Sequence, residues 1–279
     1  MVNEYDTEYL NLVSDILRNG DDKSDRTGVG TRSVFDRNLR FCLDMQRPVD
    51  ANGTYRFPLV TAKYTNFRVI VEELRWMLSG STNTNDLDAK IWDAWADAHG
   101  ELGPIYGSQW RGWPSMFSDR WHDQIARIES QLVESPDSRR IILSAWNVDD
   151  LQYMALQPCH VMAQFVVDGR GRLNCKMTQR SADVFLGLPF NIAQYALLTR
   201  MFAKVSGWEP GDLAISLGDA HIYHNHMEQA EELAFALPYH PPTVKILGSP
   251  STIDEIDMHR DIALENYDHG PRMKAPVAV

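Results

Sequence analysis

The sequence predicts an α+β fold, a large mixed β-sheet with helices packed on it, built as a single domain over residues 1–279. A chain of 279 residues with 44% hydrophobic residues is long and apolar enough for one large globular domain. Up to about residue 140, apolar residues recur at helical spacing, and beyond it the pattern changes to short strand-like runs around one long apolar helix.

The first part of the chain predicts a helix, two loops and a second helix. Residues 6–19 are amphipathic, and Gly20 can end the helix they form. Residues 21–32 predict a polar, glycine-containing loop, and residues 46–56 predict a surface loop with an Asn-Gly turn. Residues 66–79 predict a mostly buried helix.

The middle of the chain predicts a helix followed by the first strands of the sheet. Residues 120–134 carry apolar residues in helical register and stop before a proline. Residues 141–148 are strand-like. Residues 161–167 and 172–180 flank Asp-Gly-Arg-Gly, which is a hairpin signal.

The last third predicts a central helix and two more strands. Residues 191–207 are apolar on nearly every side, so we expect this helix at the centre of the fold, closed by Gly207. Residues 212–223 and 242–248 predict strands.

Composition excludes several classes of function. A net charge of −11 argues against a nucleic-acid polymer as the main ligand, because lysine and arginine contacts to phosphate dominate that affinity. No apolar run approaches the ~20 residues of a membrane span, and the first residues lack the pattern of a secretory signal. Cys42, Cys159 and Cys175 form no CxxC pair, so we expect no metal site and a reducing, cytoplasmic location.

Cys159 lies between Pro158 and His160, where a strand is predicted to begin. A nucleophilic cysteine needs nearby cations or helix dipoles that lower its pKa. Neighbouring side chains on an extended chain point apart, so a dyad of Cys159 and His160 is not expected. On this tripeptide alone, a packing cysteine is the favoured interpretation.

Four arginines stand in unusual settings. Arg26 lies in a glycine loop, Arg139 and Arg140 precede a strand, and Arg180 ends one. Arginine binds phosphate in a planar, bidentate manner, although each arginine taken singly is better explained as surface charge.

Three polar residues are candidates for hydrogen bonds to a nucleoside. Asn191 opens the apolar helix and is either an N-cap or an amide that matches a ring carbonyl beside an N–H. His221 and Tyr223 alternate on a strand and so face one side, which suits a sugar hydroxyl.

Considered together and in order, these segments resemble the thymidylate synthase family over nearly the whole chain. The matching segments are DRTGVGT, FPLVTAK, EELRWMLSGSTN, IWDAWAD, LGPIYGSQWR, PDSRRIILSAWN, ALQPCH, QRSADVFLGLPFNIAQYALL, GDAHIYHNH and APVAV.

The resemblance implies a homodimer, with a sheet face as the interface, that methylates deoxyuridine monophosphate (dUMP) at carbon 5 to thymidine monophosphate (dTMP). Methylenetetrahydrofolate would be the carbon donor and reductant, with no metal, and dihydrofolate would be released. It implies that Cys159 attacks carbon 6 of the uracil ring, which is covalent catalysis.

The resemblance also implies site residues. Arg139 and Arg140 would reach the partner's site. The remaining matches to catalytic and nucleotide contacts are Cys159, Glu73, Tyr106, His160, Asn191, Arg26, Arg180, Ser181, Asp183, His221 and Tyr223. The matches to folate contacts are Lys63, Ile91, Trp92, Trp95, Asp183, Leu186, Gly187, Phe190 and the tail residues Val277, Ala278 and Val279.

Two other functions are weighed against this one. A dUMP hydroxymethylase shares the first half of the mechanism but adds water in place of hydride. A protein that only binds nucleotide or RNA would need no nucleophile, so the set formed by Cys159, Glu73, Tyr106 and Asn191 argues against it.

Overall fold

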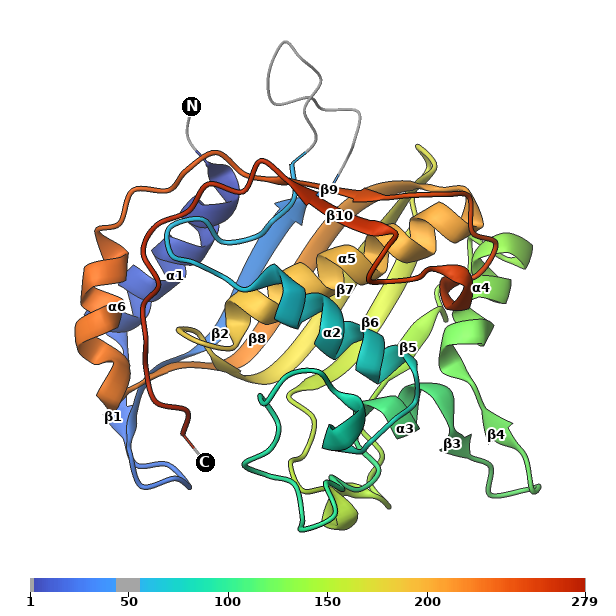
Figure 1. The fold of residues 1–279 in the computed structure, drawn as a ribbon, viewed down its shortest axis with the longest axis horizontal. Coiled ribbons are helices and arrows are strands. Elements are labelled where there is room, and N and C mark those ends of the chain that lie inside the picture. Colours follow the sequence, from blue (N-terminus) through green and yellow to red (C-terminus); the bar gives the residue numbers. More distant parts are fainter. Residues whose placement is uncertain (1–2, 44–55, 279) are drawn as a thin grey trace.

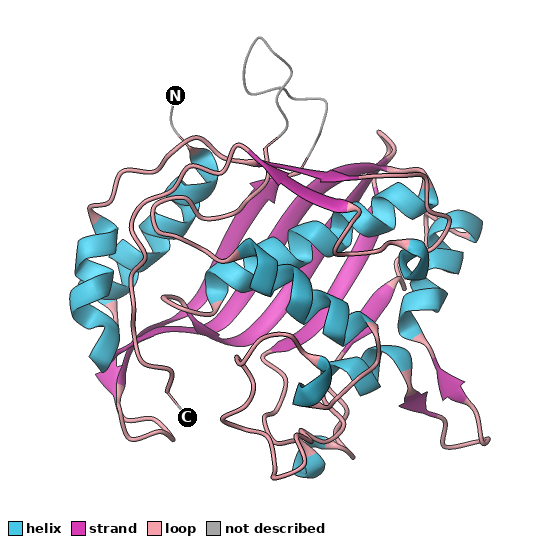
Figure 2. Cartoon of the chain, viewed as in Figure 1, coloured by secondary structure: helices cyan, strands magenta, loops and turns pink. Residues whose placement is uncertain are grey.

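The structure is a computed structural model that describes residues 3–43 and 56–278. Its centre is a six-stranded sheet (Figure 1, Figure 2). The strands, in spatial order, are β1 (Asp21–Lys23), β2 (Thr31–Cys42), β8 (Glu209–Tyr223), β7 (Arg172–Asp183), β6 (His160–Val167) and β5 (Ile142–Ser144). β7 and β8 are parallel and the other neighbours are antiparallel, so the predicted mixed sheet is confirmed.

Helices and two small sheets complete the domain. The helices are α1 (Glu4–Asn19), α2 (Phe67–Leu78), α3 (Tyr106–Arg111), α4 (Gln124–Glu134), α5 (Leu188–Ser206) and α6 (Met227–Ala234). Short 3₁₀ turns are η1 (Thr84–Asp86), η2 (Leu151–Tyr153), η3 (His224–His226) and η4 (Ile253–Glu255). The small sheets pair β3 (Trp113–Pro114) with β4 (Trp121–His122), and β9 (Thr243–Ile246) with β10 (Ile262–Glu265).

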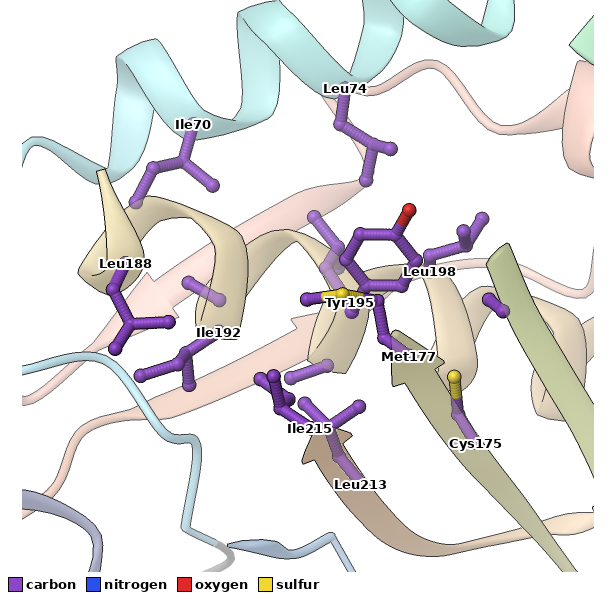
Figure 3. Close-up of a cluster of buried hydrophobic side chains, with 14 of the residues drawn as sticks. Ile70, Leu74, Cys175, Met177, Leu188, Ile192, Tyr195, Leu198, Leu213 and Ile215 are labelled. Atoms are coloured by element: carbon purple, nitrogen blue, oxygen red, sulfur yellow. The ribbon is translucent and has the colours of Figure 1, made fainter. Parts of the chain in front are cut away.

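Helix α5 connects β7 to β8 and lies across the sheet, with α2 on its outer side (Figure 1). Parallel neighbouring strands need such a crossover connection. Nearly all of α5 is buried from Leu188 to Ala203, as its all-round apolar sequence predicts. Figure 3 shows α5 side chains such as Ile192 packed between α2 and residues of β7 and β8 such as Met177 and Ile215.

The helices cover one face of the sheet. Along β7, Leu173, Cys175 and Met177 are buried, whereas the residues between them are half-exposed or exposed. The second face of the sheet carries exposed apolar side chains, including Phe35 on β2 and Val166 on β6. This alternation is typical of a sheet with one face packed on the core.

Several predicted boundaries are wrong. Residues 21–32 are not all loop, because β1 and the start of β2 lie within them. The whole of β2 escaped prediction, since its charged residues break the apolar alternation. The strand predicted over 141–148 extends only over Ile142–Ser144.

Two helix starts also differ from prediction. The helix predicted over 120–134 begins at Gln124, where the Asp123 side chain accepts a hydrogen bond from the Ala126 N–H at 3.0 Å. The helix predicted over 191–207 begins at Leu188, with Pro189 in its first turn, so Asn191 lies inside the helix and the N-cap interpretation is wrong. The loop predicted over 46–56 lies almost wholly outside the described residues.

Other predictions are confirmed. Helices α1 and α2 match the predicted ranges, and Gly207 closes α5 with a positive φ of 76°, which favours glycine. The hairpin of β6 and β7 is present as predicted. Strand β9 is present, but it pairs with β10, which was not predicted, in a separate small sheet.

The core packing generates a stability prediction. Phe165 on β6 and Phe202 on α5 are fully buried and stack edge-to-face with ring centroids 5.0 Å apart. Phe165→Ala should lower the free energy of unfolding by about 3–5 kcal/mol, because it leaves a cavity in a close-packed core. The control Phe117→Ala, at a side chain that is 98% exposed, should change it by less than about 0.5 kcal/mol in urea unfolding. Equal effects would contradict the described packing.

Candidate active site

A cleft of about 670 Å³ opens along the ends of β7 and β8. In the parallel register, Ser181 lies beside Asp219 and Asp183 beside His221. Gly218 allows β7 and β8 to approach closely, because a Cβ at this position would stand 2.7 Å from the Arg180 carbonyl oxygen. Nine sequence-predicted residues line the cleft: Arg26, Trp95, Cys159, Arg180, Ser181, Asp183, His221, Tyr223 and Ala278.

Cys159 immediately precedes β6 and is half-buried in the cleft wall. The Tyr106 hydroxyl oxygen accepts hydrogen bonds from the N–H of Cys159 at 2.8 Å and of His160 at 3.2 Å. The backbone N–H of Arg180 donates to the Cys159 carbonyl at 2.9 Å. The cysteine backbone is therefore fixed from two sides.

Burial and charge act in opposite directions on the Cys159 thiol. Burial is the larger effect and raises its pKa, whereas the Arg180 guanidinium lowers it. Arg180 itself is held beside the cysteine by hydrogen bonds to the carbonyls of Pro158 at 2.9 Å and Gln157 at 2.8 Å. Arg180 therefore lowers the pKa of Cys159 as predicted, but burial raises this pKa by more.

Glu73, on α2, is buried and is not among the residues that line the cleft. Trp92 Nε1 donates to its Oε1 at 2.7 Å, and Gln194 Nε2 donates to its Oε2 at 2.6 Å. Burial raises the pKa of Glu73 to about 7, and these two hydrogen bonds only partly oppose it. A carboxyl group with this pKa can both donate and accept protons near neutral pH.

His160, Asn191 and Gln179 form a polar group beside Tyr106. Gln179 Nε2 donates to Asn191 Oδ1 at 3.0 Å, which fixes the orientation of the asparagine amide. Burial lowers the pKa of His160 to about 4, so its ring is neutral at pH 7. The ring lies 5.2 Å from the Tyr106 ring, measured between centroids.

An aromatic and apolar wall continues from this group. The rings of Trp92 and Trp95 meet edge-to-face at 5.8 Å, and the buried Trp95 Nε1 has no hydrogen-bond partner. Four other predicted folate contacts are half-buried and do not line the cleft: Ile91, Leu186, Gly187 and Phe190.

Lys63 is buried, and its ammonium group donates to the Phe185 carbonyl at 2.6 Å. Burial lowers the pKa of Lys63 to about 8, which Asp183 partly opposes. The two residues before Lys63 are fixed by the Asp6 carboxylate on α1, which accepts hydrogen bonds from the N–H of Thr61 at 2.9 Å and of Ala62 at 2.6 Å.

The C-terminal segment runs back past α6 toward the cleft (Figure 1). Its path is fixed where the Gly270 N–H donates to the Thr61 carbonyl at 2.8 Å and His226 Nε2 donates to the Pro276 carbonyl at 2.7 Å. Ala278 reaches the cleft, whereas Val277 is 59% exposed. Val279 lies outside the described residues.

The predicted arginines separate into two groups. Arg26 and Arg180 line the cleft, whereas Arg139 and Arg140 are exposed in the turn before β5 and do not line it. The chain therefore does not bring all four arginines together within one subunit.

Sequence reasoning missed several polar residues of the cleft. Asp25 folds the Arg26 loop by accepting N–H groups from Thr27 at 3.0 Å and Gly30 at 2.8 Å, and Asp-x-Thr is a turn signal that could have revealed it. Asp219 contacts His221 Nδ1 at 2.9 Å and forms an ion pair with Lys23. The pairing of Asp219 with Lys23 joins residues 196 apart in sequence, so no local signal could have shown it.

Helices that could cross a membrane are absent from the described part of the chain. Within residues 3–43 and 56–278, no three His, Cys, Asp or Glu side chains are grouped so that they could hold a metal ion.

The fold and the cleft point to an enzyme: a half-buried cysteine lies beside an arginine in the cleft wall, and burial raises the pKa of the Glu73 carboxyl group to about 7. Comparison with protein families identifies the group more closely. The family model described as "Thymidylate synthase" matches residues 7–279, and the chain belongs to the thymidylate synthase family. The family supports transferase chemistry in nucleotide biosynthesis, either methylation of dUMP at carbon 5 or a related pyrimidine hydroxymethylation, with dUMP and a folate as substrates.

The raised pKa of Glu73 generates a prediction on stability and pH. Its pKa rises from the usual 4.5 to about 7 on folding, so the folded state holds the proton more tightly and loses stability as pH rises through this range. Between pH 4 and 8 the wild type should lose about 3 kcal/mol more unfolding free energy than Glu73→Gln, since one pKa unit is ~1.4 kcal/mol. Parallel stability curves in urea unfolding would show that Glu73 titrates normally.

Proposed function

We propose that this chain converts dUMP to dTMP through a covalent adduct on Cys159, with methylenetetrahydrofolate as carbon donor and reductant and dihydrofolate as the second product. The observation that carries the proposal is the position of Cys159 in a cleft with Arg26, Arg180 and Ser181, connected through Tyr106 and Trp92 to the carboxyl group of Glu73. The cleft supplies a nucleophile and cations for a phosphate, and Glu73 behind it supplies a proton donor of near-neutral pKa.

Arg26, Arg180 and Ser181 bind the nucleotide phosphate. Their guanidinium and hydroxyl groups match phosphate oxygens in charge and geometry. The phosphate in turn neutralises part of the arginine charge, so the sulfur of Cys159 keeps only part of the pKa lowering that Arg180 provides. His221 and Tyr223, with ring centroids 5.1 Å apart, bind the deoxyribose hydroxyl.

Asn191 selects the uracil edge. Gln179 fixes which end of its amide carries the N–H₂ group, so the amide offers donors and an acceptor in a set order. A ring carbonyl beside a ring N–H matches this order, whereas cytosine has an amino donor and a ring-nitrogen acceptor there and reverses both groups.

Cys159 acts as the nucleophile. The thiol first loses its proton to water in the cleft; the sulfur then forms a bond to carbon 6 of the ring while the ring's double bond passes its electrons to carbon 5, and the bond between sulfur and carbon 6 breaks when product leaves. Glu73 and neutral His160 exchange protons at the side of the ring carbonyl. The Tyr106 oxygen already accepts two backbone N–H groups, so its own proton remains free to hydrogen-bond near carbon 5.

The folate is bound by Trp95, Asp183 and Ala278, which line the cleft, and by residues that lie outside its lining, namely Trp92, Lys63, Leu186 and Phe190. When bound, the folate supplies the one-carbon unit and the hydride. The unpaired Trp95 Nε1 and the edge-to-face tryptophan pair suit a flat ring that carries hydrogen-bonding atoms. Ala278 at the cleft and the apolar tail help to exclude water, which favours hydride transfer over addition of water.

The nucleophile is tested by replacing Cys159. Cys159→Ala should still bind dUMP in calorimetry, because the phosphate and ring contacts remain, yet lose turnover at least ~10³-fold. Mass spectrometry should find a covalent adduct with 5-fluoro-dUMP in the wild type and none in the variant. The control Cys175→Ala, at a buried cysteine on β7, should keep the adduct. Near-normal turnover by Cys159→Ala would overturn the mechanism.

The homodimer and the roles of Arg139 and Arg140 belong to the same proposal. The helix-free sheet face with Phe35 and Val166 is the expected interface, since exposed apolar patches mark association sites. Arg139 and Arg140 are exposed and lie outside their own subunit's cleft, which supports a role for them in the partner's phosphate site.

Subunit mixing tests this arrangement. Inactive Cys159→Ala and Arg140→Ala subunits should regain up to about a quarter of wild-type activity when mixed, because each mixed dimer holds one complete site. The matched control mixes Cys159→Ala with Arg180→Ala, where both residues line one subunit's cleft, and should stay inactive. Failure of the first mixture, in dimers shown to exchange subunits, would mean that Arg140 acts within its own subunit.

A further inference from the structure

Gln194 lies on α5 one turn beyond Asn191, and only 2% of its surface is exposed. Its Nε2 donates to Oε2 of Glu73 at 2.6 Å, while Trp92 Nε1 donates to the other oxygen at 2.7 Å. The two donors approach from different elements and bind different oxygens. The carboxyl group of Glu73 is thus held at both oxygens, by Trp92 on one and by Gln194 on the other.

Two buried polar atoms near Gln194 have no partner. These are Oε1 of Gln194 itself and Nδ1 of His160. Both residues line one narrow, closed void, together with Tyr195 and Trp110, and the void has no room for a water molecule. An unpaired buried polar atom is costly, so each such atom in a folded protein calls for an explanation. The two atoms form no hydrogen bond with each other in this structure, although an imidazole N–H is a donor and an amide oxygen an acceptor.

We propose that Gln194 is a positioning residue for the reaction proposed above: its amide N–H₂ holds the carboxyl group of Glu73, from a position that lines the same closed void as His160. This inference rests on the proposed function for its role in turnover, but the link between Gln194 and Glu73 can be tested without any substrate.

The surroundings of Glu73 make its titration sensitive to this amide. The ionisable groups on the elements packed around it include Tyr106 on α3, His160 at the start of β6, and Tyr195 on α5, whose pKa is raised by burial. Burial raises the pKa of Tyr106 and lowers that of His160, so both are neutral at pH 7. Hydrogen-bond donors are therefore the main groups that stabilise the carboxylate, and removing one favours the protonated form.

The test replaces Gln194 by a residue of similar length without donor or acceptor. In Gln194→Met the pKa of Glu73 should rise by about one to two pH units, the usual effect of one lost hydrogen bond to a charged group. Infrared difference spectra of the carboxyl band, with Glu73→Gln as the reference, measure this pKa in the free enzyme. The acid limb of the pH profile for exchange of the carbon-5 proton of dUMP should move upward by the same amount.

Two further variants keep the test decisive. Thr199→Val removes a buried hydroxyl on the same helix, which donates to the Tyr195 carbonyl at 2.6 Å, and should leave the pKa of Glu73 unchanged. Gln194→Glu keeps the size and should raise the upper pKa of the carboxyl pair, because two carboxylates in contact cannot both ionise.

The outcomes separate the two proposals. An unchanged infrared pKa in both Gln194→Met and Gln194→Glu overturns the role of Gln194. An equal shift in Thr199→Val also overturns it, because the effect would then be general to the helix. Absence of any reaction of the wild type with dUMP overturns the proposed function, whatever the infrared result.

Discussion

The parallel pairing of β7 with β8 is the constraint on which the site depends. Helix α5 must cross over the sheet to connect these strands, and because it is apolar on all sides it must be buried as it does so. The resulting register places Ser181 beside Asp219 and Asp183 beside His221. Two consecutive strands therefore present their polar ends to one cleft, and α5, which joins them, carries Asn191 and Gln194 behind it.

Burial shifts the ionisable groups of the site toward their neutral forms. It raises the pKa of Glu73 to about 7 and that of the Cys159 thiol, and it lowers the pKa of Lys63 to about 8 and of His160 to about 4. At pH 7 the shifts of Glu73 and Lys63 cost folding stability, because both groups would be charged in the unfolded chain. A charged ligand interacts strongly with the groups of such a site, because charges attract or repel one another more strongly in a medium of low dielectric constant.

The sequence predicted the parts of the fold that have strong periodicity or turn chemistry. Helix α5 and the hairpin of β6 and β7 were found because a fully apolar helix and a Gly-containing turn are local signals. Strand β2 was not found, since its charged residues face solvent or pair with distant partners, as Arg40 does with Asp212.

For the site, sequence motifs were enough to predict that Cys159, Arg180 and His221 belong together, and all three line one cleft. The motifs could not predict that Asp219, Lys23 and Gln194 belong to the site, because these residues make contacts with residues far away in the sequence. Nor could residue types alone show that Asn191 lies inside a helix, since asparagine suits both a cap and a ligand contact.

The most direct test of the account is the identity of the product. The purified enzyme is incubated with dUMP and methylenetetrahydrofolate, the nucleotide product is weighed by mass spectrometry, and dihydrofolate is followed by its absorbance. A water-excluding cleft that delivers hydride predicts dTMP and one dihydrofolate for each nucleotide converted. A hydroxymethyl nucleotide formed without dihydrofolate would contradict it, and would mean that water reaches the ring first.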